Sequence, residues 1–447
     1  MAVNAFPGNL TPAFLDDVLA KSAEKGGDTL AQHTWAVVSR LADQYRLRPE
    51  LAKQLGDDRL WHRLYWGCFL HDFGKAALGF QERLRQPKVS NAWSEGRQRH
   101  EVLSLAFADA AFPSKHPDRL PVIAVIIAHH KDFDGERADS IIHKYGGRKP
   151  DPQQEARVQF LIDQLNPELI RRLWRWFNEY GVPWSQALGF DQNDVFPSAV
   201  IEKPLTAENI RNALRDFSAY HLKRKDGDIT ISEIARDMHY RGLILTADHA
   251  ASAGAPPFPP MRLTMEIASK PLEKNKQTPN PHQIQAANSL EGSAILTAPT
   301  GSGKTEAALM WAARQIQLRP APRLFYTLPY QASMNAMADR LCDAFFGVEL
   351  TNLVENQDIT IQHSRATLKF YQDAMDSDSG AAEAPGASQR AREQTDKTRL
   401  NYYPIQVFSP YQMLKAAYQL KGYETACWLI ITNALFIFDV NSTLIEP

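Results

Sequence analysis

Seven residues among the first 250 positions are of the types that bind divalent transition metals, and they follow one another in a clear order. Imidazole nitrogens and carboxylate oxygens together suit Mn, Fe, Co or Ni as well as Zn. Adjacent residues on a helix point about 100° apart, so a neighbouring His–Asp pair can share one ion only where a helix ends or crosses another. Other helices must then supply the remaining ligands. The candidate metal ligands are His33, His71, Asp72, His100, His129, His130 and Asp248.

Each of these residues is weak evidence when taken alone. An isolated HD dipeptide is usually a surface accident, and one of His129 and His130, which follow the apolar run PVIAVIIA, could simply cap a buried helix. The same region carries histidines with no evident role, such as His62 and His116. The order of the whole series favours a metal site over chance.

The series resembles the HD phosphohydrolase superfamily, whose H…HD…D signature is carried here by His33, His71, Asp72 and Asp248. The segments HDFGKAALGFQ (71–81), IAHHKD (127–132) and ADHAAS (247–252) extend the likeness over nearly all of the first 250 residues. The remaining histidines are similar to the second-metal ligands of the nuclease domain in CRISPR-associated helicase-nucleases of type I systems. These are His100, His129 and His130.

This resemblance implies a two-ion nuclease that uses Mn, Ni, Co or Fe. Two ions about 3.5–4 Å apart activate a water molecule and clamp the phosphate oxygens. Asp72 would bridge the ions at the catalytic centre, and Lys75, one turn after His71, would offer its ammonium group to the scissile phosphate. Without the resemblance, Lys75 reads equally well as a solvated helix lysine.

A second motif, APTGSGKT (298–305), follows the apolar run AILT, where we expect a strand, and opens an apolar stretch that predicts a helix. This context is that of a P-loop. Its backbone N–H groups would hold the phosphates of Mg-ATP, Lys304 would reach the β- and γ-phosphates, and Thr305 would hold Mg²⁺. The candidate nucleotide-binding residues of the loop are Thr300, Gly301, Ser302, Gly303, Lys304 and Thr305.

Three more segments resemble superfamily 2 helicase motifs. Gln283 in TPNPHQIQ is similar to the glutamine that reads the adenine edge, and 326–341 and 407–418 resemble elements that grip single-stranded DNA. Asp439 ends the apolar run NALFIFD, where the resemblance places a Mg²⁺-binding acidic box. The catalytic Glu of that box and the second RecA-like lobe are not in the sequence. We therefore expect a truncated, frameshifted or deliberately shortened helicase that does not unwind DNA.

Composition favours a soluble chain of more than one domain. The formal net charge of −1 means that any DNA contact needs local basic patches. Three widely spaced cysteines suggest buried thiols in a reducing compartment. No leader peptide and no membrane span is expected, so the predicted location is the cytoplasm.

The predicted architecture is an all-α HD-type metal phosphohydrolase domain followed by an incomplete α/β RecA-like lobe. Helix-period apolar residues dominate the first part, and short β-rich runs such as RLFYTLPY and ACWLIITNALFIFD mark the second. The expected divisions are 1–255 for the HD nuclease domain, 256–280 for a Pro-rich linker and 281–447 for the partial helicase domain. Residues 376–397 are expected to form a mobile loop.

The expected function is metal-dependent cutting of single-stranded DNA in CRISPR type I interference, where recruitment by a guide-RNA surveillance complex (Cascade) is implied by the family. Two alternatives remain: an HD phosphohydrolase acting on nucleotides, and a non-hydrolysing adaptor that binds ATP and DNA. RRLWRWFNEY (171–180) and HLKRKDG (221–227) mix basic and aromatic residues and could line a DNA track, although helix packing explains the tryptophans equally well.

Overall fold

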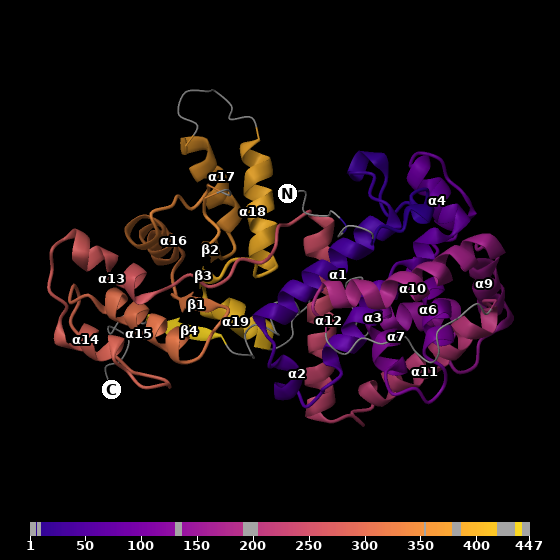
Figure 1. Ribbon diagram of the computed structural model, residues 1–447, viewed down its shortest axis with the longest axis horizontal. Coiled ribbons are helices and arrows are strands. Elements are labelled where there is room, and N and C mark those ends of the chain that lie inside the picture. Colours follow the sequence, from indigo (N-terminus) through magenta and orange to yellow (C-terminus); the bar gives the residue numbers. More distant parts are fainter. Residues whose placement is uncertain are drawn as a thin grey trace. The chain divides into compact units, whose positions relative to one another are not determined.

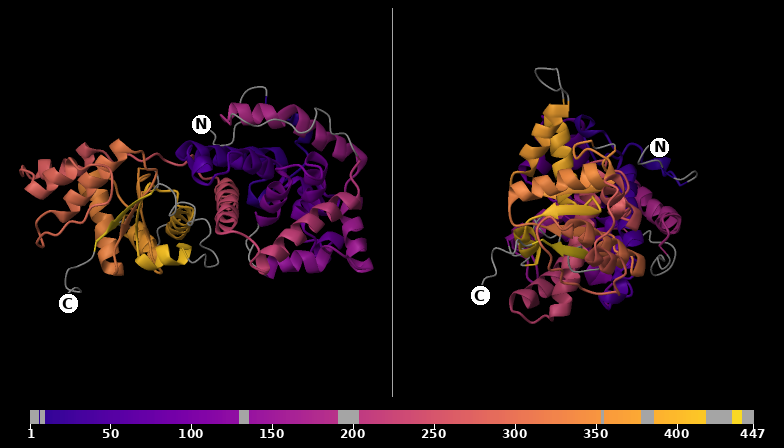
Figure 2. Two further views of the ribbon diagram at one scale, coloured as in Figure 1. Left: turned by 90° about the horizontal axis from the view of Figure 1, so that it is seen from below. Right: turned by 90° about the vertical axis from the view of Figure 1, so that its left-hand side faces the viewer.

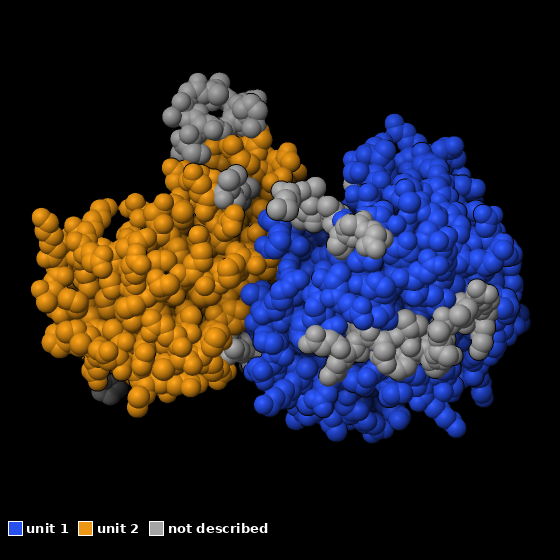
Figure 3. Space-filling model, viewed as in Figure 1, with its two compact units in different colours: residues 1–257 blue, residues 258–447 orange. Residues whose placement is uncertain are grey.

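The computed structural model describes residues 6, 10–129, 136–190, 204–352, 355–377, 386–417 and 434–439. The chain divides into two compact units, residues 1–257 and 258–447 (Figure 3). Each unit has its own core, and each is described here by itself.

The first unit is helical throughout its described residues, apart from one isolated β-bridge between Leu19 and Thr29 (Figure 1). This confirms the predicted all-α architecture. Its α-helices are α1 (Leu30–Leu47), α2 (Leu51–Gln54), α3 (Leu60–Leu70), α4 (Leu78–Arg85), α5 (Ala92–Glu95), α6 (His100–Ala111), α7 (Arg119–Ala128), α8 (Glu136–Tyr145), α9 (Pro152–Asp163), α10 (Pro167–Ala187), α11 (Ala207–Lys225) and α12 (Ile231–Ser252). Its 3-10 helices are η1 (Ala13–Leu15), η2 (Ala23–Lys25) and η3 (Phe73–Ala76).

Local sequence fixes where the two helices that frame the site begin. In α1, Thr29 accepts a hydrogen bond from the Gln32 N–H while the Gln32 side chain accepts one from the Thr29 N–H. Thr230 and Glu233 form the same reciprocal arrangement at the start of α12. Such capping boxes satisfy backbone donors that a helix start leaves unpaired. Helices α1 and α12 then pack along each other.

Aromatic side chains fill the centre of the first unit. Trp66 and Phe69 of α3 contact Phe177 of α10, with ring centroids 4.8 and 6.1 Å apart. Trp174 and Trp176 are 1% and 0% exposed. Trp174, Trp176 and Phe177 therefore belong to the core, which favours helix packing over a DNA track as the role of these aromatic residues. The period of α10 points them inward, since they recur at helix spacing.

The second unit is an α/β unit with a parallel sheet of order β2-β3-β1-β4, flanked by helices on both sides (Figure 2). This agrees with the predicted partial RecA-like lobe. Its strands are β1 (Leu324–Thr327), β2 (Ile359–Gln362), β3 (Ile405–Phe408) and β4 (Leu435–Phe438). Its helices are α13 (Met265–Lys274), α14 (Pro281–Ala287), α15 (Lys304–Leu318), α16 (Gln331–Arg340), the π-helix η4 (Leu341–Phe346), α17 (Ala366–Ser377), α18 (Ala387–Arg399) and α19 (Pro410–Ala417).

Two local predictions for this unit are wrong. The run AILT (294–297) is not a strand, and Ile295 is 98% exposed. The described sheet ends at β4 and gives this run no neighbour to pair with, although its apolar composition is that of a buried parallel strand. Residues 387–397, expected in a loop, form most of α18, because Ala387, Ala391 and Gln394 recur at helix spacing and are buried.

The segment for which a linker was expected contains α13. Thr264 caps this helix by accepting a hydrogen bond from the Ile267 N–H. Ala268 and Leu272 lie one turn apart and join the core of the second unit, where α13 packs against α15. The apolar residues at helix spacing are few, and the Pro and Lys residues around them make the segment resemble a linker in the sequence.

No helix in the described part of the chain is long and apolar enough to cross a membrane. Cys68 and Cys342 are buried free thiols, as expected, and Cys427 lies outside the described residues.

Candidate metal centre and nucleotide loop

Five helices of the first unit bring six of the seven candidate metal ligands together. His33 lies on α1, His71 caps the C-terminus of α3, Asp72 follows it, His100 begins α6, His129 caps the C-terminus of α7 and Asp248 lies on α12. Two adjacent residues inside a helix would point in different directions. His71 and Asp72 can face the same site because the chain turns from α3 into η3 at Asp72. His130 lies outside the described residues.

The Asp72 carboxylate is the centre of this cluster. Its Oδ2 atom lies 3.2 Å from both His33 Nε2 and His71 Nε2, and its Oδ1 atom lies 3.1 Å from His100 Nε2 and 3.7 Å from His129 Nε2. The two oxygens therefore face two separate sets of imidazoles. Each set forms with Asp72 a group whose ligand atoms lie within 4.8 Å of one another.

Backbone carbonyls orient two of the imidazoles. His71 Nδ1 lies 2.6 Å from the carbonyl oxygen of Cys68, and His129 Nδ1 lies 2.5 Å from that of Ile126. A histidine that donates its Nδ1–H to a carbonyl has its Nε2 lone pair free for a metal. Both Nε2 atoms point to Asp72, so the tautomer needed for metal binding is already favoured.

The two acidic ligands and Lys75 make the centre strongly polar. Asp248 Oδ1 lies 3.2 Å from His33 Nε2, and Lys75 Nζ lies 2.6 Å from Asp72 Oδ2. Burial acts to raise the pKa of Asp72, but His71 and Lys75 outweigh it and hold that pKa well below its usual range. Burial also acts to raise the pKa of Asp248, and His33 lowers it instead. Both carboxyl groups are therefore anionic, as metal ligands must be.

The residues present fit a group of divalent ions. Apart from the ion pair of Asp72 Oδ2 with Lys75, both Asp72 oxygens, His33 Nε2 and His71 Nε2 are buried without a hydrogen-bond partner of good geometry among the described residues. Buried polar atoms normally have such partners, so these orphaned acceptors need another explanation. Divalent cations supply it, because histidine nitrogens and carboxylate oxygens are their ordinary ligands.

Two residues that support the HD turn could not be singled out from the sequence. Ser104 Oγ accepts a hydrogen bond from the Gly74 N–H (2.8 Å) and donates to the carbonyl oxygen of His71 (2.8 Å). A Cβ at Gly74 would lie 2.0 Å from the carbonyl oxygen of His100, so only glycine fits there. In the sequence, nothing shows that the HDFG segment and the segment with a serine one helical turn after His100 are in contact. Only the structure therefore identifies the supporting role of these residues.

In the second unit, the predicted P-loop turns into α15 at Gly303, which has φ +84°. Lys304 Nζ folds back to donate to the carbonyl oxygen of Ala298 at 2.9 Å, and Asn280 Nδ2 donates to the carbonyl oxygen of Ser302 at 3.0 Å. Thr300, Gly301 and Ser302 form the exposed or half-buried turn before it. The loop thus opens a helix, as its sequence predicts.

Gln283 is fully buried and engaged on both ends of its amide. Its Oε1 accepts from the Asn280 N–H at 2.8 Å and its Nε2 donates to the carbonyl oxygen of Gly303 at 3.1 Å. It therefore joins the start of α14 to the P-loop. Its expected contact with an adenine stays a prediction.

Asp439 and Thr305, expected on either side of a Mg²⁺ ion, are linked through Tyr326. The Tyr326 hydroxyl donates to Asp439 Oδ2 at 2.7 Å, and it also interacts with Thr305. Asp439 follows β4, which pairs with β1, the strand that carries Tyr326. Arg340 contacts Thr305 Oγ1 at 3.3 Å and pairs with Glu306. Neither Tyr326 nor Arg340 has a sequence signal that would have marked it.

Comparison with known families decides the relationship of this chain. Residues 20–253, more than half of the 447, match the family model "Cas3, HD domain". The chain belongs to the Cas3 HD-domain family. Residues 280–373 match a second model, "DEAD/DEAH box helicase", which agrees with the P-loop and the parallel sheet.

Similar full-length proteins carry the Cas3 name. The chain is 25% identical over 395 residues to the CRISPR-associated nuclease/helicase Cas3 of Methanothermobacter thermautotrophicus, covering 80% of this chain and 43% of that protein. It is 27% identical over 416 residues to a putative Cas3 of Myxococcus xanthus, covering 86% and 50% respectively. The chain therefore spans about half the length of these curated relatives.

Solved structures show the same fold. The crystal structure of T. fusca Cas3 with AMPPNP superposes with a TM-score of 0.52 at 18% identity, covering 96% of this chain and 47% of that one. The structure without nucleotide gives the same TM-score and coverage. Both units of this chain thus have the Cas3 architecture.

Proposed function

We propose that this Cas3-family chain is a metal-dependent nuclease that cuts single-stranded DNA in CRISPR type I interference. The observation that carries the proposal is the Asp72 carboxylate, whose two oxygens face the His33/His71 pair and the His100/His129 pair. Such a carboxylate can bridge two ions. Mn, Ni, Co and Fe fit the mixed histidine and carboxylate donors.

Divalent ions bound there would supply an activated water and neutralise the charge of the phosphodiester. The role of the protein's residues follows from their positions. Asp72 lies between the two histidine pairs and contacts both of them. Asp248 contacts His33 of the first pair. Cys68 and Ile126 carbonyls keep two imidazoles in the tautomer that presents Nε2.

Lys75 is the one cation among the described residues that touches the cluster, at 2.6 Å from Asp72. Its side chain is 12% exposed, so its ammonium group can turn toward an incoming phosphate oxygen. A charge-assisted hydrogen bond of this kind strengthens as negative charge builds up on that oxygen. We assign Lys75 this catalytic role.

The P-loop of the second unit is proposed to bind Mg-ATP, with Lys304 at the phosphates and Thr305 and Asp439 at the ion. No P-loop residue belongs to the Asp72 cluster, whose described members all lie in the first unit. We therefore expect that cutting at the cluster does not need ATP. The relatives, of which this chain covers about half, are named CRISPR-associated nuclease/helicases, and recruitment of this chain by a guide-RNA surveillance complex is part of the proposal.

The test is cutting of circular single-stranded DNA by the purified chain after metal removal. Mn²⁺, Ni²⁺, Co²⁺ or Mg²⁺ is added back with and without ATP, beside Asp72→Ala and the control Asp58→Ala, an exposed aspartate of the same unit. Cutting that needs metal, ignores ATP and disappears only in Asp72→Ala is the expected result. Preferential hydrolysis of free nucleotides would favour a nucleotide phosphohydrolase instead, and tight ATP binding with no cutting would favour an adaptor.

A further inference from the structure

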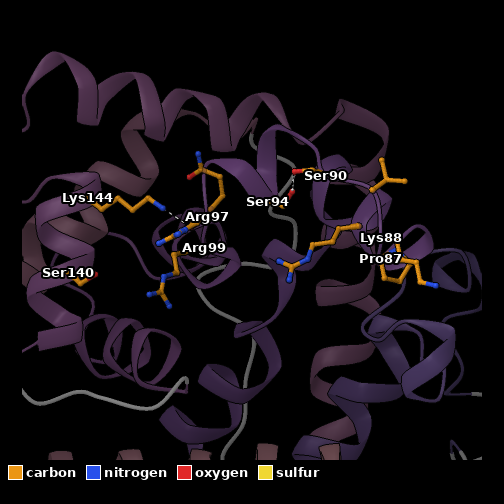
Figure 4. Close-up of a pocket in the computed structure, with 11 residues that line it drawn as sticks. Pro87, Lys88, Ser90, Ser94, Arg97, Arg99, Ser140 and Lys144 are labelled. Atoms are coloured by element: carbon orange, nitrogen blue, oxygen red, sulfur yellow. Dashed lines mark hydrogen bonds between the residues drawn. The ribbon is translucent and has the colours of Figure 1, made fainter.

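A strongly basic pocket of about 710 Å³ lies in the first unit between the 83–99 region and α8 (Figure 4). Five of its lining side chains are cations and none is a carboxylate. In Figure 4, the Arg97, Arg99 and Lys144 side chains gather at one end and Lys88 lies at the other. The cationic lining residues are Arg83, Lys88, Arg97, Arg99 and Lys144.

The pocket adjoins the metal centre through short covalent and packing links. Arg99 directly precedes the candidate ligand His100. Arg83 lies one turn after Phe80 on α4, and the Phe80 ring packs against the His100 ring with centroids 5.3 Å apart. Two of the cations are thus close to the candidate ligand His100, Arg99 as its neighbour in the chain and Arg83 through the contact of Phe80 with His100.

The loop that presents Arg97 and Arg99 is held in a fixed shape. Lys144 Nζ donates to the carbonyl oxygens of Gly96 and Arg97 at 2.8 and 2.6 Å. The buried Tyr145 hydroxyl accepts from the Arg99 N–H at 2.9 Å and donates to Gln98 at 2.9 Å. Arg97 has φ +46°, which is uncommon for a residue other than glycine. Strained backbone that its surroundings hold in place is a frequent mark of function.

The positive charge of this pocket is poorly neutralised. The buried Glu101 pairs with Arg99 at 3.3 Å, but among the described residues Arg83, Lys88 and Arg97 form no ion pair. Partial burial and the charges of Arg99 and Arg157 lower the pKa of Lys144. With a net charge of −1 over the whole chain, this concentration of cations is a local feature. It is suited to a polyanion.

We propose that this pocket binds phosphates of the DNA strand that is cut at the Asp72 centre. These phosphates neighbour the scissile phosphate on the same strand. The inference rests on the proposed nuclease function, which it deepens by assigning a strand-binding subsite. Five spaced cations fit a chain of phosphates better than a single anion, since each phosphate of a strand needs its own positive partner. Ser90 and Ser94 add hydroxyl groups between the two ends of the pocket.

The experiment compares the full chain with the triple variant R83Q/K88Q/R97Q. These three side chains are exposed, Arg83 in the last turn of α4 and the other two outside any helix, whereas Arg99 and Lys144 are left in place because they hold the loop. The matched control K53Q/K115Q/R215Q removes three exposed cations of the same unit that lie outside the pocket and outside the 171–180 and 221–227 segments. Two substrates are used: a long single-stranded oligodeoxynucleotide and bis(p-nitrophenyl) phosphate, which is too small to reach both centre and pocket.

The pocket variant is expected to raise KM for the oligonucleotide about tenfold or more and to reduce the salt dependence of its affinity by up to about 2 logarithmic units per decade. Hydrolysis of the small ester and the behaviour of the control variant should not change. Equal KM values in the pocket and control variants would overturn the proposal. So would an equal fall on both substrates, which would mean that the substitutions disturb the metal centre.

Strand binding is also measured by fluorescence anisotropy in the presence of a chelator. If the unsubstituted chain cuts neither substrate with any metal, the proposed nuclease function fails. The pocket assignment then still stands or falls on whether R83Q/K88Q/R97Q weakens strand binding more than the control does.

Discussion

His71 Nδ1 lies 2.6 Å from the carbonyl oxygen of Cys68, one turn earlier on the same helix. That carbonyl belongs to the last turn of α3, where backbone acceptors lack partners within the helix. The helix end therefore serves two purposes. It satisfies its own acceptor, and it turns His71 Nε2 toward Asp72. His129 uses the end of α7 in the same way.

Asp72→Asn should abolish metal loading of the first unit while leaving it folded. The amide keeps the shape of the carboxylate but loses the charge that two ions would share. We expect affinity for Mn²⁺ to fall by at least about 100-fold, the upper end of what even indirect supporting residues contribute. Isothermal titration calorimetry on the metal-free chain measures this, with circular dichroism to check folding. Unchanged Mn²⁺ affinity would remove Asp72 from the ligand set.

Lys75→Gln should slow cutting without loss of bound metal. The ammonium group lies beside the cluster and is not one of its ligands, so the variant should keep its affinity for metal and lose the hydrogen bond to the phosphate together with the ion pair to Asp72. A hydrogen bond to a charged group contributes about 1.5–3 kcal/mol, which corresponds to a fall in kcat of roughly 10- to 100-fold. Lys75→Arg should restore part of the rate. A variant that cuts normally would show that Lys75 is only a solvated lysine.

The Asp118 carboxylate makes the stability of the first unit sensitive to acid. Burial acts to raise its pKa, but His62, Arg59 and Arg63 lower it far below the usual value. Because the folded pKa is depressed, the contribution of Asp118 is complete above the pKa of an unfolded aspartate, about 3.9. It is lost as the pH falls below that value toward the folded pKa.

Asp118→Asn should therefore lower the free energy of unfolding near neutral pH by about 1.5–3 kcal/mol, since Arg59 and Arg63 lose the charged acceptor of their hydrogen bonds. Part of the loss of stability on acidification should disappear with it. Denaturant unfolding at a series of pH values, beside the exposed control Asp58→Asn, measures both effects. If the variant and the unsubstituted chain lose stability in parallel below pH 4, Asp118 is not the acid-sensitive group.

Gly303→Ala should disrupt the nucleotide loop and leave DNA cutting intact. A Cβ at this position would lie 2.2 Å from Gln283 Nε2, in addition to the cost of placing alanine at φ +84°. The control Gly347→Ala has φ +67° with nothing within 4 Å of the added atom, so it reports the backbone cost alone, about 1–2 kcal/mol. ATP binding, measured by a fluorescent analogue, should fall in the first variant only. Equal binding in both would mean that Gln283 does not need this close approach.

The sequence predicted the cluster of candidate metal ligands better than the surroundings of that cluster. The ligand types and their order could be read directly, because an ion requires particular atoms, and the helical period of the flanking segments showed that they come from different helices. The partners of those ligands were out of reach. Ser104 and the Cys68 carbonyl act through tertiary contacts that no local pattern reports.

The second unit shows where local patterns fail. The strand β1 was predicted correctly because its apolar run is short and bounded by Pro residues, whereas AILT is also a short apolar run and remains exposed. Strand formation depends on a neighbour as well as on propensity. Conversely, α18 is polar enough to resemble a loop, and it is a helix because small residues on one side pack against α17.

The central proposal is that Asp72 would be a ligand of two divalent ions, and anomalous diffraction from crystals grown with Mn²⁺ tests it most directly. We predict two anomalous peaks on either side of the Asp72 carboxylate, one against His33, His71 and Asp248 and the other against His100 and His129. Both peaks should be absent in Asp72→Ala crystals grown in the same way. A single peak, or peaks away from Asp72, would contradict the account.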